Sequence, residues 1–175
     1  PLFAKAYPAI YRHLSLHEDK LKIRDDQGKF WWELRSCIYW DEFLVPKIMY
    51  PDIAQHPKFL LDESSSFSSN TTYFIPSSDT WLLAILNSCL MWWFYGTITS
   101  SIRGGFVRYF SQYMEQLPIP SATATQKAPI TERVRKILAD PDSPDVPRLE
   151  SEIDALVYKL YGLTNEEVFL VEGKT

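Results

Sequence analysis

The stretch WLLAILNSCLMWWFYGTI, residues 81–98, decides the fold, because its 18 residues carry no charge. A membrane-spanning helix needs about 20 mostly apolar residues. This stretch is shorter, and Asn87, Ser88 and Gly96 interrupt it with polar or small side chains. Its length and polarity therefore favour a buried core helix over a membrane span, and no membrane partner is expected.

The residues before this stretch predict where the helix begins. Ser78 or Asp79 can cap a helix that runs from about 80 to 95. We expect Asn87 to hydrogen-bond locally, because it interrupts an apolar face. The side chains expected to be buried are Trp81, Leu82, Ile85, Leu86 and Leu90.

Three short runs upstream of the helix have the composition of strands. They are Pro46–Tyr50, Phe59–Asp62 and Thr72–Ile75, and the polar loop Ser64–Asn70 separates the last two. The sequence therefore predicts an α+β fold. A small twisted, mainly antiparallel sheet packs on the core helix and is followed by a helical C-terminal tail.

The tail differs in composition from the rest of the chain, with few aromatic residues and many charges. Pro129 can open one helix, Gly162 can end a second helix over 148–161, and Thr164 with Glu167 forms a capping-box pattern for a third. The predicted organisation is a recognition domain at 1–120, a linker at 121–128 and a helical extension at 129–175.

Charge and cysteine content exclude several classes of protein. The net charge is −4, made up of +1 over 1–60, −2 over 61–120 and −3 over 121–175, so a strong basic excess is missing. Cys37 and Cys89 form no CxxC pair. Disulfide scaffolds and Cys-type zinc sites are therefore excluded, and a reduced, cytoplasmic setting is expected.

Motifs for catalysis are missing from the sequence. It contains no G-x-S-x-G elbow, P-loop or G-x-G-x-x-G. His13 and His17 have a metal-like spacing, but no third ligand follows them. No catalytic residue, metal site or cofactor is expected in this chain, and a binding module is favoured over an enzyme.

One short segment has the residues of a nucleic-acid contact. Gly104 and Gly105 lack side chains and allow a close approach of the backbone, while Arg103 and Arg108 carry fork-shaped donors that fit guanine or phosphate. Tyr109 follows directly. We take these five residues as candidate DNA contacts, although the pattern also fits an ordinary hairpin turn with solvated arginines.

Two lysines on or beside the predicted strands are further candidates. Lys47 and Lys58 could contact phosphates. Both also fit ordinary surface lysines.

The order of several short motifs carries a family resemblance that spans nearly the whole chain. The motifs are Tyr7–Tyr11, Trp32–Arg35, Phe43–Pro51, Phe59–Asp62, Tyr73–Ile75, Leu82–Ser88, Arg103–Gly105, Leu117–Pro120 and the tail Ile153–Thr164. In this order they resemble the TaqI-like C-terminal specificity domain of Type II restriction–modification adenine methyltransferases, including the fused Type IIG enzymes.

The resemblance implies a function in DNA recognition. The chain would bind double-stranded DNA in a sequence-specific way and position a target adenine for base flipping. The partner would be a methyltransferase domain with S-adenosylmethionine, located before Pro1 in the parent chain. The fragment alone is not expected to methylate DNA.

A second hypothesis comes from the many aromatic residues. The chain could be a protein–protein interaction module that binds a partner subunit. Salt separates the two hypotheses, because DNA binding by Lys and Arg weakens steeply as salt rises, whereas an aromatic interface changes little.

Overall fold

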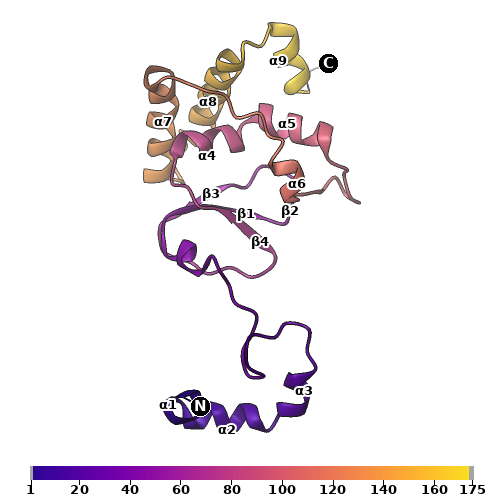
Figure 1. Ribbon diagram of the computed structural model, residues 1–175. Helices are drawn as coiled ribbons and strands as arrows, with labels where there is room; N and C mark the ends of the chain where they lie inside the picture. The colour runs from indigo at the N-terminus through magenta and orange to yellow at the C-terminus, as the bar shows by residue number, and fades with distance from the viewer. Residues whose placement is uncertain (1, 174–175) are drawn as a thin grey trace. The chain divides into compact units, whose positions relative to one another are not determined.

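The structure is a computed structural model that describes residues 2–173. The chain forms two compact units, Pro1–Trp40 and Asp41–Thr175. We call their described parts the N-terminal unit (2–40) and the main unit (41–173) and describe each by itself (Figure 1). The boundary after Trp40 lies inside the region that the sequence predicted as one domain, 1–120. Residues 174 and 175 of the predicted extension lie outside the described residues.

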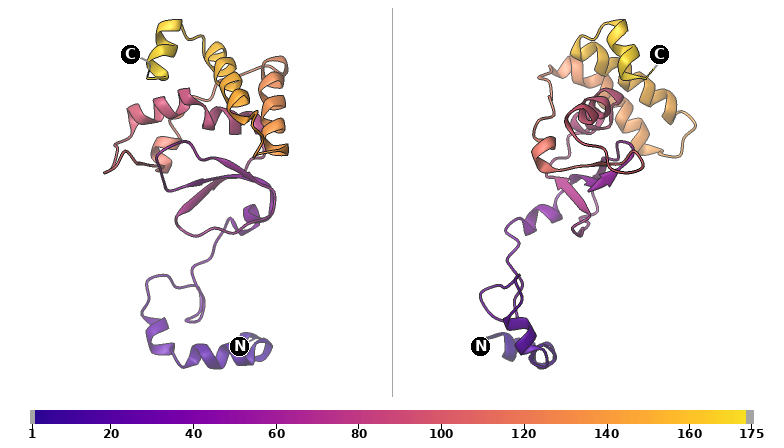
Figure 2. Two further views of the ribbon diagram at one scale, coloured as in Figure 1. Left: turned by 180° about the vertical axis from the view of Figure 1, so that it is seen from behind. Right: turned by 90° about the vertical axis from the view of Figure 1, so that its right-hand side faces the viewer.

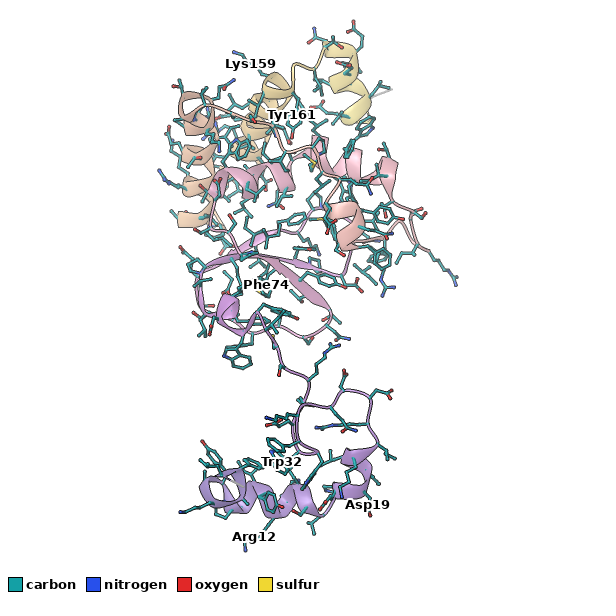
Figure 3. The ribbon with its side chains drawn as sticks, in the orientation of Figure 1. Arg12, Asp19, Trp32, Phe74, Lys159 and Tyr161 are labelled. Carbon is teal, nitrogen blue, oxygen red and sulfur yellow. The ribbon has the colours of Figure 1, made fainter. Side chains whose placement is uncertain are left out.

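Aromatic rings hold the N-terminal unit together. Its helices are α1 (Leu2–Ala6), α2 (Pro8–Ser15) and α3 (Glu18–Lys22). Trp32 lies at the centre of the rings (Figure 3), stacked on Phe30 at 4.8 Å and on Phe3 at 5.7 Å between centroids. None of residues 2–40 is buried in the structure, so this unit has no closed core of its own.

The main unit contains the predicted sheet. Strand β1 (Lys47–Pro51) lies between β3 (Leu60–Asp62) and β4 (Thr72–Ile75), and both pairings are antiparallel. The three strand predictions are therefore confirmed. A second, two-stranded sheet pairs β2 (Ile53–Ala54) with β5 (Val107–Arg108). Two residues are too few to produce an alternating pattern, so the sequence did not indicate these strands.

The apolar stretch forms two helices, so the prediction of one helix over 80–95 was wrong. They are α4 (Thr80–Asn87) and α5 (Cys89–Ile98), and Asp79 caps α4 by accepting from the Trp81 N–H at 2.9 Å. Ser88 has an extended backbone, with ψ at 150°, and its Oγ accepts from the Met91 N–H at 3.2 Å. Ser88 therefore ends one helix and caps the next.

Among residues 2–173, no single helix is long and apolar enough to cross a membrane, although α4 and α5 together pass the length and composition test across a 60° bend. Within the main unit, α4 lies in the core, whereas α5 buries Leu90, Met91 and Tyr95 and exposes Trp93. Trp81, Ile85, Leu86 and Leu90 are buried as predicted, whereas Leu82 is only half-buried.

Asn87 connects the end of α4 to the sheet. Its amide accepts from the Phe59 N–H at 3.1 Å and donates to the Phe59 carbonyl at 2.9 Å, in the manner of a paired strand residue. It also donates to the Leu83 carbonyl at 3.1 Å, which is the local bond that the sequence predicted. The polar residue that interrupts the apolar face therefore positions the segment leading into β3.

The tail begins earlier than predicted. Helix α7 (Ala124–Ala139) starts inside the predicted linker, because Thr123 and Gln126 form a capping box, and Pro129 lies within the helix instead of opening it. Helix α8 (Val146–Tyr161) ends at Gly162 with φ at +71°, as predicted. The predicted capping box of Thr164 and Glu167 opens α9 (Asn165–Val171). Two short elements complete the chain, the 3-10 turn η1 (Trp40–Leu44) and helix α6 (Ser111–Met114).

The tail and the sheet share one core. Figure 2 shows α4 lying between the sheet and helices α7 and α8. Ile48 of the sheet, Ile85 of α4, Ile130 of α7 and Val157 of α8 are almost completely buried and belong to one apolar cluster. The tail helices thus pack on the sheet domain, and the described part of the extension is integral to the main unit.

This shared core makes a prediction about stability. Replacing Ile130 by Ala should lower the free energy of unfolding by about 2–5 kcal/mol, because a fully buried side chain is truncated. The loss should appear as a shift of a single denaturant transition monitored by circular dichroism. Leu138→Ala in the same helix, where the side chain is exposed, should change it by about 0.5 kcal/mol or less. A separate early transition of the tail alone would contradict the shared core.

Candidate nucleic-acid interface

The segment with the paired glycines forms a tight exposed turn. The Ile102 N–H donates to the Phe106 carbonyl at 2.7 Å, and the Gly105 N–H donates to the Ile102 carbonyl at 3.2 Å. Gly104 and Gly105 have φ values of +89° and +76°, which residues with a side chain rarely adopt. The glycines therefore close the turn and leave Arg103 at its tip.

The turn is fixed to the second sheet. The Gln55 side-chain amide donates to the Gly104 carbonyl at 2.9 Å, and Gln55 directly follows β2. We call the β2–β5 pair together with residues 102–106 the ribbon. Because its base is hydrogen-bonded and its tip is anchored, the ribbon presents Arg103 from a supported backbone.

Side chains alternate along the second half of the ribbon and the two residues that follow it, Tyr109 and Phe110. Val107 and Tyr109 are buried, whereas Phe106, Arg108 and Phe110 are exposed. This period of two is that of a strand with one face on the core. The exposed face of the ribbon therefore carries one arginine between two aromatic rings.

Tyr109 is part of the core, so it is not available as a DNA contact in this structure. The side chain is 2% exposed, and burial raises the pKa of its phenol above the ordinary value. Its ring contacts those of Tyr50, Phe59 and Tyr95. The prediction included Tyr109 because it follows Arg108 directly in the sequence. In the structure, neighbouring residues of this extended segment face opposite sides, so Arg108 is exposed and Tyr109 is buried.

The two arginines have different surroundings. Arg103 is exposed, and none of residues 2–173 forms an ion pair or hydrogen bond with its guanidinium. Arg108 is 46% exposed and donates from Nε and Nη2 to Oδ2 of Asp52, at 3.2 and 3.0 Å. Its guanidinium carbon also lies 5.4 Å from the centre of the Phe110 ring. Arg103 is thus a free cation, whereas Arg108 is held in place.

Lys47 is not a surface residue, and we no longer regard it as a phosphate contact. Its side chain is 0% exposed, and its ammonium donates to the Phe43 carbonyl at 2.9 Å and to the Asp62 carboxylate at 2.5 Å. Lys47 lies at the start of the central strand, on the sheet face opposite to Ile48. Phe74, on the same sheet, points away from α4 in Figure 3, and η1 covers this second face through Phe43.

Serines complete the environment of the buried pair. The Asp62 carboxylate accepts from the Ser64 hydroxyl at 2.6 Å and from the Ser66 N–H at 2.9 Å. Hydrogen bonds from Lys47 and then from Ser64 hold the pKa of Asp62 well below its usual range. The serine-rich loop predicted from the sequence therefore has a structural role, because it satisfies the oxygens of a buried carboxylate.

Lys58 remains a candidate. It is exposed and lies between β2 and β3, next to Phe59, whose backbone is fixed by Asn87. Within the described chain, no hydrogen bond or ion pair engages its ammonium. A supported backbone and a free cation are the features that a phosphate contact needs.

Sequence reasoning missed two residues of this surface, Asp52 and Gln55. Asp52 contacts Arg108 across 56 residues, and Gln55 contacts Gly104 across 49 residues. Neither contact has a local signal, because both depend on how the ribbon pairs.

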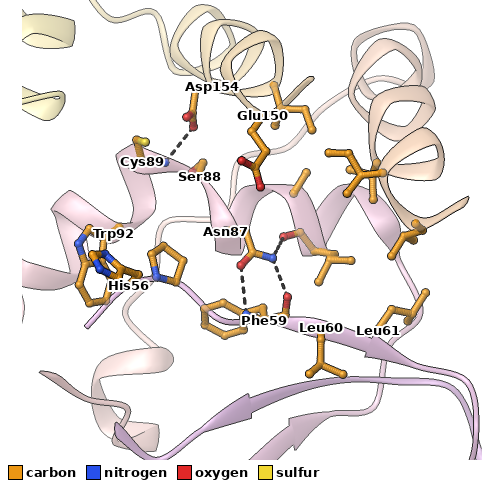
Figure 4. Close-up of a pocket in the computed structure, with 17 residues that line it drawn as sticks. His56, Phe59, Leu60, Leu61, Asn87, Ser88, Cys89, Trp92, Glu150 and Asp154 are labelled. Carbon is orange, nitrogen blue, oxygen red and sulfur yellow. Dashed lines mark hydrogen bonds between the residues drawn. The ribbon is translucent and has the colours of Figure 1, made fainter. Parts of the chain in front are cut away.

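The main unit also contains a largely apolar cavity of about 560 Å³ (Figure 4). It lies between the segment leading into β3, the break between α4 and α5, and helices α7 and α8. At its rim, Asp154 accepts from the Cys89 N–H at 2.8 Å, and burial raises the pKa of this carboxyl. This bond joins the start of α5 to α8, so its role is structural.

Comparison with known proteins identifies the family. The family model of the TaqI-like C-terminal specificity domain matches residues 6–119, which is more than half of the chain. The chain therefore belongs to this family. The match covers residues 6–40 of the N-terminal unit and the whole ribbon, and it ends before the tail helices.

The relatives are Type II methyltransferases. The chain is 28% identical over 168 residues to M.PaeR7I of Pseudomonas aeruginosa, a match that covers 92% of this chain and 28% of that protein. It is 27% identical over 169 residues to M.XhoI of Xanthomonas vasicola, covering 93% of this chain and 29% of that protein. The chain thus spans less than a third of the length of these relatives.

The buried ion pair makes a prediction about stability. Lys47→Met should lower the free energy of unfolding by about 3–5 kcal/mol, because Asp62 is left buried without its counter-charge. The double variant Lys47→Met/Asp62→Leu should recover most of this loss in denaturant titrations. A single variant as stable as the parent would contradict the structural role.

The same pair predicts an acid dependence. Because the folded pKa of Asp62 is lowered, its contribution to stability is present above the unfolded value of about 3.9 and is lost as the pH falls below it. Denaturant midpoints of the parent should therefore fall more steeply below about pH 4 than those of the double variant. Parallel curves would contradict this assignment.

Proposed function

We propose that this chain recognises a sequence in double-stranded DNA as the specificity module of a Type II restriction–modification adenine methyltransferase. The observation that carries the proposal is the ribbon, a two-stranded element with a free arginine at its tip. The major groove of B-DNA is wide enough for such an element. Membership of the family and the names of the relatives support the same function.

The chemistry of the tip fits base recognition. An arginine presents two parallel N–H donors that match O6 and N7 of guanine, and such a pair discriminates by about 1–3 kcal/mol against the wrong base. The glycines behind Arg103 keep side-chain bulk away from the groove. Arg103 is therefore the residue we expect to read a base, and Lys58 the one we expect to contact a phosphate.

Charge limits how this module binds. The chain carries −4 overall and −3 over 121–175, so the tail helices repel phosphate and should not approach the bases. A few cations on the ribbon cannot supply all the phosphate contacts of a stable complex. We infer that a second domain shares them.

That second domain is the proposed methyltransferase portion of the parent chain. It would hold S-adenosylmethionine, which supplies the methyl group, and would receive the flipped adenine. The residues described in this chain would position the DNA. This division of roles agrees with the small share of the relatives that the chain covers.

The N-terminal unit is the surface we assign to this partner. A unit of this size seldom folds without a partner or a covalent staple, and none of its residues from 2 to 40 is buried. The most exposed apolar residues are Leu2, Leu16, Ile23 and Ile38, between 78% and 95% exposed. An apolar surface of this kind marks a protein–protein contact. It also keeps the interaction-module hypothesis open as an alternative.

The main test uses the full-length protein with Arg103→Ala. The preferred duplex is first found by selection from a randomised library, and binding to it should weaken about 5- to 150-fold. Binding to the duplexes in which the base pair read by Arg103 is changed should weaken little, so that discrimination is lost at this one position. Arg135→Ala, which removes the same charge from the exposed face of α7, should leave discrimination unchanged.

Two outcomes would contradict this assignment. Equal discrimination by variant and parent at every position would make the turn an ordinary hairpin. A uniform loss with all sequences would make Arg103 a phosphate contact. Binding that hardly changes with salt would favour the interaction module instead.

A second prediction tests the N-terminal unit. Ile23→Glu in the full-length protein should lower thermal stability and methylation together, because a charge would be buried in the proposed contact. Leu170→Glu, on exposed α9, should change neither. An Ile23→Glu protein with the stability and methylation of the parent would refute the contact with the methyltransferase portion, whatever the result for Arg103.

A further inference from the structure

We propose that Asp52 is a positioning residue that presents Arg108 to a guanine in one orientation. The inference rests on the proposed function and adds a second reading residue with a different physical basis. Arg103 would reach its base as a free side chain, whereas Arg108 would be oriented before DNA arrives.

Asp52 engages one edge of the guanidinium. Nε and Nη2 of Arg108 both donate to Oδ2, at 3.2 and 3.0 Å. The Nη1 group and the second hydrogen of Nη2 are left free of Asp52. These two donors form the end of the guanidinium fork, and the end of the fork is one of the edges that fits O6 and N7 of guanine.

The carboxylate and the guanidinium are attached to one rigid frame. The Asp52 N–H donates to the Thr71 carbonyl at 2.9 Å, and the Asp52 carbonyl accepts from the Tyr109 N–H at 2.8 Å. The Arg108 carbonyl accepts from the Tyr95 hydroxyl at 2.7 Å. Since Tyr95 and Tyr109 are 1% and 2% exposed, the core fixes the backbone at both ends of the pair.

The carboxylate of Asp52 is largely buried and the guanidinium of Arg108 is half-exposed, as expected if Asp52 orients Arg108 for a ligand. The Asp52 side chain is 15% exposed, so DNA cannot readily displace Arg108 by contacting the carboxylate. The Arg108 side chain is 46% exposed, with the Phe110 ring 5.4 Å from its guanidinium carbon. The ring restricts the plane of the guanidinium, and the free edge stays accessible.

A fixed arginine recognises DNA differently from a free one. Ordering a long side chain on binding costs conformational entropy, and a side chain already held in place avoids most of that cost. Its geometry also fits fewer acceptors, so it binds non-specific phosphates less readily. Asp52 should therefore increase discrimination at one base pair without increasing affinity for DNA in general.

Removing Arg108 is a poor test of this idea. Oδ1 of Asp52 is buried and has no hydrogen-bond partner among residues 2–173, so Arg108 is the group that compensates the carboxylate. Arg108→Ala would leave that charge half-desolvated and could unfold the ribbon. A change at Asp52 separates orientation from the presence of the arginine.

The experiment compares Asp52→Asn with Glu152→Gln in the full-length protein. Each removes one negative charge and weakens ion pairs to arginine, since Glu152 on the tail helices accepts from Arg133 at 2.7 Å and from Arg148 at 2.5 Å. Binding is measured with the preferred duplex, its single-base variants and a random duplex. Asp52→Asn should lower discrimination about tenfold at one base pair and keep or raise affinity for the random duplex. Glu152→Gln should leave discrimination unchanged.

The outcomes are distinct from those of the Arg103 test. Folded Asp52→Asn protein that discriminates like the parent at every position overturns the inference, even if Arg103→Ala loses its base preference. An equal loss with all sequences also overturns it, since the pair would then only brace the ribbon. If both Arg103→Ala and Asp52→Asn keep the base preference of the parent, the result contradicts the proposed function itself.

A second variant, Asp52→Glu, tests the inference if Asp52→Asn does not fold. Asp52→Glu keeps the charge but moves the carboxylate by one methylene, which displaces the guanidinium. Discrimination should again fall at the same base pair, with a thermal midpoint near that of the parent. Unchanged discrimination in Asp52→Glu would refute the positioning role.

Discussion

The burial of α4 between the sheet and the tail helices is the constraint on which the main unit depends. One face of the sheet and the apolar faces of α7 and α8 must both be covered, and α4 covers them from opposite sides. Such a helix has to be apolar nearly all round. Asn87, the polar last residue of α4, is tolerated because the backbone of Phe59 satisfies its amide.

The break after Asn87 changes the direction of the apolar stretch. A 60° bend separates α4 from α5, and α5 reaches the ribbon. There the Tyr95 hydroxyl bonds to the backbone of Arg108, and its ring packs on Tyr109. The core thereby supports the surface proposed to read DNA, because loops are precise only where a scaffold fixes their ends.

Two ion pairs illustrate how burial changes the meaning of a charge. Lys47 and Asp62 are enclosed, so the pair is structural and is completed by serine hydroxyls and backbone donors. Arg108 and Asp52 lie at the surface with unequal exposure, so the cation keeps a free edge. Both pairs join residues far apart in the chain, and neither lysine nor arginine reveals from its type alone which environment it occupies.

The sequence by itself determined the three strands of the main sheet, the apolar core segment and the helical tail, in this order. The uncharged stretch, the three strands, the Gly162 end of α8 and the capping box at Thr164 are local signals, and each follows from backbone or side-chain chemistry within a few residues. The box of Thr123 and Gln126 was a signal of the same kind and could have been used to begin α7 correctly. The order of the motifs also indicated the family.

Tertiary structure decided which side of each element is buried and what each cation contacts. It placed Lys47 in the interior because both faces of β1 are covered. It placed Tyr109 there because the two-residue strand before it does not specify which face meets the core. It paired Arg108 with Asp52 and anchored Gly104 through Gln55, contacts that arise only when β2 and β5 come together. The candidate site could be located from local chemistry, but the roles of its residues depend on long-range pairing, for which the chain has no local code.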